Sequence, residues 1–359
     1  MLAAAIPAVS ACASTPSPSA SPIDTQAAVV TSLEPSPTLV PPASLPASAS
    51  PLVTAAPSPS PTARPSPSQP SQPSPTPRPT PHPTPRPTPR PTPRPTSGGL
   101  PVFGHVFEIV MENHAIGEII GNASAPYINS LASRYGLATN YTAIRHPSEP
   151  NYFALWSGST QGATDDGTYD FRSGRTLADQ IEASGRSWHV AAQNVPTGSC
   201  FTGRNAAGGP DGAGSYTRRH EPAISWTSVS GNAQRCSRIT DLAHFNPNSG
   251  SFWLVIPNVC NDMHDCSVAT GDAFLRRFIP RITGSAAFAD RGVILLTWDE
   301  GAGAGARVAT IVISPLAKRG FRSATPHSHY SLLHTVEASW HLGCLANACS
   351  ANTLSEFFR

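Results

Sequence analysis

The chain carries little net charge, which excludes one class of partner. Its formal charge is +2 over 359 residues. Residues 1–97 hold five arginines against one Asp and one Glu, a net of +3, so the rest of the chain is close to −1. A protein that binds nucleic acid needs a basic face against the phosphate backbone. The sequence therefore predicts no nucleic-acid partner.

Residues 13–99 lack the composition needed to bury a hydrophobic core. Pro, Ser, Thr and Ala dominate this segment, and it ends in a Pro-Thr-Pro-Arg repeat. Frequent proline fixes φ, removes backbone donors and favours the extended polyproline II conformation. We therefore expect a disordered, semi-rigid stalk over residues 13–99, followed by one folded domain over residues 100–359.

The first twelve residues lack the positive charge and the long apolar core of a complete secretory signal. Val9-Ser10-Ala11-Cys12 nevertheless resembles the lipobox at which bacterial lipoproteins are cleaved and lipidated. A stalk directly after a lipidated cysteine would hold a domain away from the membrane. We expect a lipid anchor on Cys12, a true start upstream of Met1, and export as an envelope lipoprotein or secreted bacterial protein. The alternative is a chance cysteine in low-complexity sequence.

The folded part also lacks paired Cys-x-x-Cys motifs, which argues against a structural zinc site. Apart from Cys12 the chain has six cysteines, an even number that favours disulfides in an exported protein. Six cysteines allow many pairings. Proximity along the chain favours three of them: Cys200–Cys236, Cys260–Cys266 and Cys344–Cys349.

Continuous apolar runs alternate with amphipathic segments in the folded part. The expected strands are Val106–Met111, Ala138–Ile144, Ser187–Gln193, Ser251–Pro257, Val293–Trp298 and Ala309–Ser314. The expected helices are Ala125–Tyr135, Thr176–Ser184, Gly271–Ile282 and Ser331–His341. Runs of this kind fit strands covered on both faces, so the pattern predicts an α/β fold, a three-layer α/β/α sandwich with a mostly parallel central sheet. Thr176 is expected to cap a helix N-terminus and Gly185 its C-terminus. Residues 196–214 have no periodicity and predict a surface excursion.

Polar side chains follow two of the expected strands. Glu112 and Asn113 come directly after the first, and Asp299 and Glu300 after a late one. Ligands bind beyond the carboxyl ends of strands in open α/β sheets, and paired carboxylates repel unless a cation lies between them. We expect these four residues to hold one divalent metal ion. Oxygen ligands suit Ca, Mg or Mn, and nearby histidines leave Zn or Fe open. The alternatives are a helix cap for the first pair and an ordinary turn for the second.

Ser148 is the candidate nucleophile. It precedes Pro150, and proline is favoured in the first turn of a helix, where backbone amides and the helix dipole favour a phosphoryl group. A serine hydroxyl attacks phosphorus once a cation has lowered its pKa. His146 and Asn151 flank it as candidate catalytic and substrate-binding groups. The residues thus predict a metal-dependent phosphoester hydrolase. The alternatives are a plain N-cap serine and a locally satisfied histidine.

A second polar cluster, residues 258–265, follows the strand that ends at Pro257. Within it, His264 and Asp265 are potential ligands or proton carriers. Asx-turn chemistry inside a small disulfide loop is the alternative. His220 and His329 are weaker single candidates for substrate binding, and a satisfied structural histidine is the alternative for each.

With these motifs assembled, the chain resembles the bacterial phosphoesterase family that groups phospholipases C with secreted acid phosphatases, a branch of the alkaline phosphatase superfamily. The resemblance spans Val102 to Leu342. Its motifs are Glu112-Asn113-His114, His146-Pro147-Ser148-Glu149-Pro150-Asn151-Tyr152, Arg219-His220-x-Pro222, Asn261-Asp262-x-His264-Asp265, Trp298-Asp299-Glu300-Gly301 and His329-Tyr330-Ser331. In two places the chain departs from the family: Ser328 stands where Asp is frequent, and Gly301-Ala-Gly-Ala-Gly305 replaces a frequent His-Gly-Gly.

The resemblance implies an alkaline-phosphatase-like fold in which Ser148 is both nucleophile and exchangeable metal ligand. The small secreted acid phosphatases look most similar, and some of them act on phosphatidylinositol 3-phosphate. We expect a monomeric phosphate monoesterase whose substrate is a small phosphoester or a phospholipid head group, with membrane contact through Cys12. The alternatives are a phospholipase C-type phosphodiesterase and a non-catalytic binding module on the envelope.

Overall fold

The computed structural model describes residues 99–196, 198, 200–207, 215–303 and 305–358. The expected stalk and Cys12 lie outside these residues. The described chain begins at Gly99 and enters its first strand, β1 (Val106–Met111), seven residues later.

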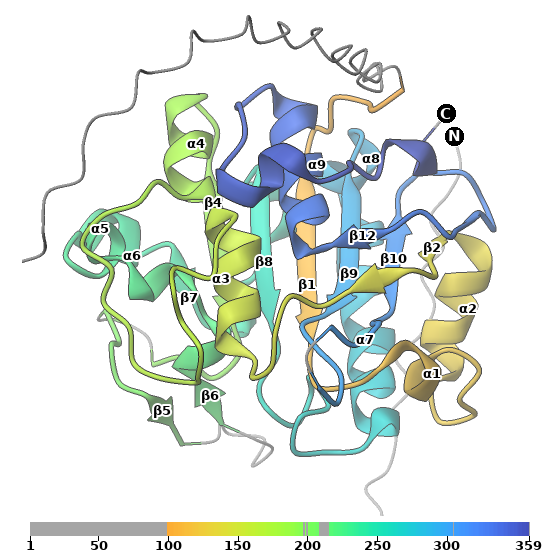
Figure 1. Ribbon diagram of the computed structural model, residues 1–359, viewed down its shortest axis with the longest axis horizontal. Coiled ribbons are helices and arrows are strands. Elements are labelled where there is room, and N and C mark those ends of the chain that lie inside the picture. The colour runs from red at the N-terminus through yellow and green to blue at the C-terminus, as the bar shows by residue number, and fades with distance from the viewer. Residues whose placement is uncertain (1–98, 197, 199, 208–214, 304, 359) are drawn as a thin grey trace, which may run out of the picture. The chain divides into compact units, whose positions relative to one another are not determined.

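An eight-stranded sheet forms the centre of the fold, in the order β11-β2-β10-β9-β1-β8-β4-β7 (Figure 1). Five neighbouring strands are parallel to one another: β9 (Val293–Trp298), β1, β8 (Phe252–Ile256), β4 (Trp188–Ala192) and β7 (Ile239–Thr240). β10 (Thr310–Ile313) runs antiparallel to both β9 and β2 (Gly136–Ala138), and β11 (Arg322–Ser323) pairs with β2 in parallel. The expectation of a mostly parallel sheet is confirmed.

Helices cover both faces of this sheet, so the domain has the expected three layers. α3 (Glu149–Ser157), α4 (Leu177–Ala183) and α9 (His329–Trp340) pack together in front of the sheet in Figure 1. α7 (Val268–Thr283) lies behind it, in contact with α2 (Pro126–Arg134) and α8 (Ala286–Ala289). Every residue of β1, β8, β9 and β10 is buried, as continuous apolar runs require when both faces are covered. None of the helices in the described residues is long and apolar enough to cross a membrane.

The remaining elements are short. They include the helices α1 (Ile116–Ile119), α5 (Thr227–Ser230) and α6 (Ala233–Cys236), the 3₁₀ turn η1 (Arg218–His220), and the strand pairs β3 (Tyr141–Thr142) with β12 (His327–Ser328) and β5 (Asn205–Ala206) with β6 (Tyr216–Thr217). The expected caps of α4 are confirmed. The Thr176 hydroxyl accepts from the Asp179 amide, and Gly185 follows the helix with φ of 75°.

One expected strand is wrong. The chain from Ala138 to Ile144 is divided between β2 in the main sheet and β3 in a separate two-stranded sheet. Thr139 donates to the Ser323 carbonyl through both its backbone N–H and its hydroxyl. The side-chain amide of Asn140 donates to the Ala324 carbonyl. These bonds turn the chain away from β10. The helix α7 also starts three residues earlier than expected, because the Ser267 hydroxyl caps it at the Thr270 amide.

Three disulfides pair as the sequence predicts: Cys200–Cys236, Cys260–Cys266 and Cys344–Cys349. The first attaches the chain before β5 to the end of α6. Each of the other two closes a short ring, because its cysteines are only six and five positions apart in sequence. The disulfides therefore tie loops to the sheet domain, while apolar packing holds the layers together.

One acidic side chain lies inside this apolar centre. Glu108, on β1, lies between Leu254 and Leu295 of the neighbouring strands and is 2% exposed. Burial raises the pKa of Glu108 from 4.5 to about 8. The carboxyl group is therefore neutral in the folded protein at pH values where it is ionised in the unfolded chain.

Replacing Glu108 by Gln should stabilise the protein, and more strongly at high pH. Because the pKa of Glu108 is raised on folding, its contribution to stability is most favourable below pH 4.5 and declines as the pH rises through about 8. Glutamine does not titrate, so the gain of Glu108→Gln should be larger at pH 8 than at pH 5 by on the order of 3 kcal/mol. Denaturant unfolding at both pH values measures it, with the exposed Asp290→Asn as control. An equal gain at both pH values would refute this assignment.

Candidate functional site

The strand register brings the expected metal ligands together. Met111 pairs with Trp298 at the ends of β1 and β9, so Glu112 and Asp299 leave the sheet side by side. The Asp299 amide donates to the Met111 carbonyl at 2.9 Å, and the Glu112 amide donates to the Asp262 carbonyl at 2.9 Å. Three loops, after β1, β8 and β9, therefore meet at the carboxyl edge of the sheet.

Ser148 lies between the acidic groups of two of these loops. It occupies the N-cap position of α3, and its hydroxyl donates to Glu112 Oε2 at 3.0 Å, with Glu300 Oε1 3.2 Å away. The serine is buried. The candidate nucleophile and three of the expected metal ligands, Glu112, Asp299 and Glu300, thus form one cluster.

The α3 amides, by contrast, do not point at a ligand. The Glu149 amide donates to Asp166 Oδ1 at 3.0 Å, Pro150 has no N–H, and the Asn151 amide donates to the Ser148 carbonyl. These two amides are therefore occupied by protein acceptors, and the contact of a phosphoryl group with this helix start stays a prediction. The helix dipole of α3 contributes to the electrostatics at Ser148.

Four carboxylates are buried within this cluster: Glu112, Asp262, Asp299 and Glu300. Burial, and then the charges of Asp299 and Asp262, raise the pKa of Glu112 well above its ordinary value. Burial and Glu300 raise the pKa of Asp299 to about 7, and burial raises that of Glu300 to about 7. Among the described residues, Asp299 Oδ2 has no hydrogen-bond partner. Buried like charges with an unpaired oxygen are the environment that a divalent cation stabilises, so these residues fit the expected metal.

Asn113 lies beside this donor set with φ of 55°, a left-handed conformation that asparagine tolerates. The backbone N–H of Asn113 donates to Asp299 Oδ1 at 3.1 Å, which orients that carboxylate. A second donor set shares Glu112. One ligand atom each of Glu112, His220 and His264 lies within 4.8 Å of the others, so the two histidines border the same centre.

His220 lies deeper than a substrate-binding role requires. Its Nε2 is 3.4 Å from Glu112 Oε1 and its Nδ1 is 3.3 Å from Asp262 Oδ2. The ring stacks on Tyr152 at a centroid distance of 5.4 Å, and the Tyr152 hydroxyl donates to Glu112 Oε1 at 2.5 Å. Burial, then Arg219 and His264, lower the pKa of His220 well below its ordinary value. A neutral histidine and a tyrosine thus support Glu112 from one side.

Two other histidines lie closer to solvent. His264 is 26% exposed; its Nδ1 is 2.6 Å from Asp265 Oδ1 and its Nε2 is 3.1 Å from Arg219 Nη2. His146 is 52% exposed, with Nδ1 2.8 Å from Glu300 Oε2. Asp265 itself is exposed and reaches the site only through His264. Both histidines are therefore placed to exchange protons between the carboxylate cluster and water.

Asn151 and His329 are buried, and other protein groups occupy their polar atoms. The Asn151 side chain accepts from the Ile144 and Arg145 amides and donates to the Arg145 and Pro147 carbonyls, so it braces the loop before Ser148. His329 Nε2 lies 2.5 Å from the Asp299 carbonyl, and its Nδ1 lies 2.9 Å from the Tyr141 hydroxyl. Burial lowers the pKa of His329 to about 4. These contacts favour supporting roles over the substrate contacts that we expected.

Sequence reasoning missed two site residues, Tyr152 and Asp262. Tyr152 belongs to the motif around Ser148, one helical turn further along α3, and this spacing is the signal that places it on the same face. Asp262 belongs to the polar cluster after β8, where nothing in the sequence ranks it above Asp265.

Comparison with known proteins gives a consistent picture. The model described as "Phosphoesterase family" matches residues 120–343. The chain is 32% identical over 266 residues to a phosphatidylinositol-3-phosphatase of Mycobacterium tuberculosis, covering 73% of this chain and 85% of the relative. It is 28% identical over 264 residues to an acid phosphatase of Aspergillus fumigatus, covering 70% of this chain and 58% of that longer relative. Among solved structures, a protein in the alkaline phosphatase superfamily from Vibrio parahaemolyticus aligns with a TM-score of 0.48 and 10% identity, over 71% of this chain and 70% of the other.

Removing divalent metal should lower the melting temperature, because the buried carboxylates then lose their counter-charge. A ligand that binds only the folded state at about 100 times its Kd stabilises it by about 2.7 kcal/mol, or roughly 5–10 °C for a domain of this size. Calorimetry with and without a chelator, followed by elemental analysis, measures the effect and identifies the ion. Asp299→Asn should remove most of the shift, while Asp290→Asn should keep it. Identical melting curves without any bound metal would exclude the site.

Proposed function

Because the chain belongs to the phosphoesterase family, and is therefore a phosphoric ester hydrolase, we propose that it hydrolyses phosphate monoesters with Ser148 as the nucleophile. The observation that carries this proposal is the position of the Ser148 hydroxyl between Glu112 and Glu300, at 3.0 and 3.2 Å. Glu112, Asn113, Asp299 and Glu300 would hold one divalent cation there. Such a cation lowers the pKa of the hydroxyl and neutralises phosphoryl oxygens.

The protein groups then perform a two-step displacement. Ser148 gives its proton to one of the two carboxylates that it contacts, Glu112 or Glu300. Its Oγ then forms a bond to phosphorus while the bond from phosphorus to the leaving alcohol breaks. The departing oxygen takes a proton from His264 or His146, the two histidines that reach solvent. Water next attacks the phosphoserine and gives a proton to the histidine that protonated the leaving group. The bond from phosphorus to the serine oxygen breaks, phosphate is released, and this oxygen takes back the proton held by the carboxylate.

The neutral His220 and Tyr152 orient Glu112 throughout both steps. His329 orients the backbone of Asp299 through its contact with the Asp299 carbonyl. These buried groups keep the carboxylates in place while their charge environment changes, which is how a preorganised site lowers a barrier.

The substrate class follows from the relatives. The Mycobacterium tuberculosis relative is named for phosphatidylinositol 3-phosphate and the fungal ones for acid phosphatase activity, and both names describe the removal of a terminal phosphate. We extend this to the present chain as a phosphate monoesterase whose substrates include phosphoinositides.

The site of action is proposed to be outside the cytoplasm. Three disulfides in the described residues are typical of an oxidising compartment. A lipid anchor at Cys12 would then hold a monomeric domain at the cell envelope; a protein released into the medium is the other form of this proposal.

Ser148→Ala should abolish hydrolysis of p-nitrophenyl phosphate, with kcat lower by roughly a thousandfold or more, because the attacking oxygen is removed. Asp299→Asn should have a comparable effect through loss of a charged ligand. The exposed Ser124→Ala should retain full activity. Steady-state kinetics of folded variants, checked by circular dichroism, decide the matter; near wild-type turnover by Ser148→Ala would remove this serine from the reaction.

The preference for monoesters is tested separately. We expect kcat/KM for a short-chain phosphatidylinositol 3-phosphate to exceed that for phosphatidylcholine by about 100-fold, since a diester adds a second substituent and removes a phosphoryl charge. Phosphate release reports the first reaction and diacylglycerol release the second. Faster release of diacylglycerol would instead identify a phospholipase C-type phosphodiesterase.

A further inference from the structure

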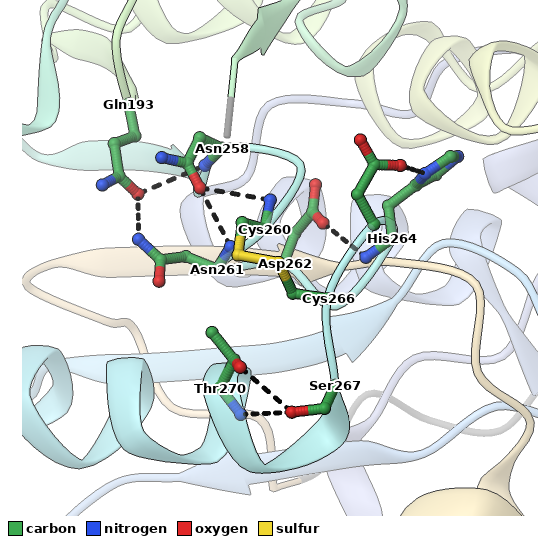
Figure 2. The surroundings of a disulfide bond; sticks show 10 residues. Gln193, Asn258, Cys260, Asn261, Asp262, His264, Cys266, Ser267 and Thr270 are labelled. Atoms are coloured by element: carbon green, nitrogen blue, oxygen red, sulfur yellow. Dashed lines mark hydrogen bonds and ion pairs between the residues drawn. A yellow bond between two sulfur atoms is a disulfide. The ribbon is translucent and has the colours of Figure 1, made fainter. Parts of the chain in front are cut away.

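The loop after β8 contains a disulfide ring that carries two residues of the site. Cys260 and Cys266 enclose residues 261–265, which include Asp262 and His264. Cys260 is largely buried, and its sulfur bonds to that of the half-buried Cys266 with a Cα–Cα distance of 4.6 Å. Figure 2 shows Asp262 and His264 rising from this ring on the same side.

Asp262 connects the ring to both buried and open parts of the site. Its Oδ1 accepts from the His264 amide at 2.7 Å, and its Oδ2 lies 3.3 Å from His220 Nδ1. Its carbonyl accepts from the Glu112 amide at 2.9 Å. One residue of the ring therefore touches His264, His220 and Glu112, and a shift of the ring would move all three relative to Ser148.

The first half of the loop is held from outside the ring. The side-chain oxygen of Gln193, which follows β4, accepts from the backbone N–H of Asn258 at 3.2 Å and from the side-chain amide of Asn261 at 2.9 Å (Figure 2). The Asn258 side chain in turn accepts from the amides of Cys260 and Asn261. The second half joins α7, whose N-cap is Ser267. The disulfide connects these two fixed ends across the residues that serve the site.

The backbone between the two cysteines adopts a conformation that needs such a closure. Met263 has φ of 85°, in the left-handed region that side chains other than Gly, Asn and Asp rarely adopt. Its side chain is buried in the space left by Gly271, where an added Cβ would lie 2.4 Å from Met263 Cγ. The Asp265 amide donates to the Val259 carbonyl at 2.7 Å and completes the turn.

The length of this ring does not by itself explain its place in the site. The entropy that a disulfide removes from the unfolded chain grows slowly with the length of the loop it closes. Cys260 and Cys266 are six positions apart, against 36 for Cys200–Cys236. By this route the short ring stabilises the fold less than the longer one, and its distinguishing feature is the set of side chains that it carries.

We propose that the Cys260–Cys266 disulfide is a positioning element of the active site: it fixes Asp262, and through it His220 and His264, so that hydrolysis depends on the bond being formed. The proposal rests on the proposed phosphomonoesterase function. It assigns to Asp262 a positioning role, because this residue contacts Glu112, His220 and His264.

The test compares two double variants that each remove one short ring. Cys260→Ser/Cys266→Ser should lower kcat/KM for p-nitrophenyl phosphate at least tenfold and weaken competitive inhibition by inorganic phosphate. Cys344→Ser/Cys349→Ser removes a ring of nearly equal size after α9 and should keep both values within about twofold of wild type. Assays run well below the melting temperature of each variant. Wild-type kinetics in the first variant, or equal losses in both, would overturn the proposal.

Coupling to Asp262 separates positioning from general loosening. Asp262→Asn alone should reproduce most of the loss, and adding it to Cys260→Ser/Cys266→Ser should cost little more, because both changes disturb the same contacts. Losses that multiply independently would count against the proposal. If the first double variant does not fold, mild reduction of the native Cys344→Ser/Cys349→Ser protein, with alkylation of the released thiols identified by mass spectrometry, supplies the same comparison.

Failure of this inference differs from failure of the proposed function. An unmodified protein without activity on any monoester would refute the function. An active protein whose kinetics are unaffected by loss of the Cys260–Cys266 bond would refute only the positioning role.

Discussion

The structure depends on the pairing of β1 with β9, because this register places two acidic groups, Glu112 and Asp299, next to each other in a buried region. Each of these parallel strands is stabilised by apolar burial along its length. Each is followed directly by a carboxyl group whose charged form burial disfavours. The energy of the sheet thus holds Glu112 and Asp299 where neither would remain charged alone. A cation and a serine hydroxyl are the groups that make such a pair favourable, and both requirements point to phosphoester chemistry.

Around that pair, the protein uses different elements for rigidity and for exchange with solvent. Tyr152 and His220 are stacked and buried against one face of Glu112, and His329 fixes the backbone of Asp299. His146 and His264 are at the open side. The buried groups therefore come from α3, η1 and α9, while the two more exposed histidines are on loops.

The sequence predicted the layers of the fold, since continuous apolar runs and amphipathic segments alternate with little ambiguity. It also predicted that the carboxylates after β1 and β9 converge, because the ends of parallel strands meet at one edge of a sheet, whereas the place of Ser148 beside them came from the family resemblance. It did not predict the split between β2 and β3, which depends on hydrogen bonds to residues far along the chain. Nor did it separate Asp262 from Asp265: the two differ in burial, and burial is a property of the assembled loop.

The helix α9 extends from the site to the edge of the sheet where the described chain begins. At its start His329 contacts the Asp299 carbonyl, and at its end the Trp340 indole donates to the Phe103 carbonyl at 2.8 Å. Twelve residues of helix and six of strand each cover roughly 20 Å between these edges. The described chain, which starts at Gly99, therefore enters the domain on the side of the sheet remote from Ser148, and α9 joins that side to the site in a single helix.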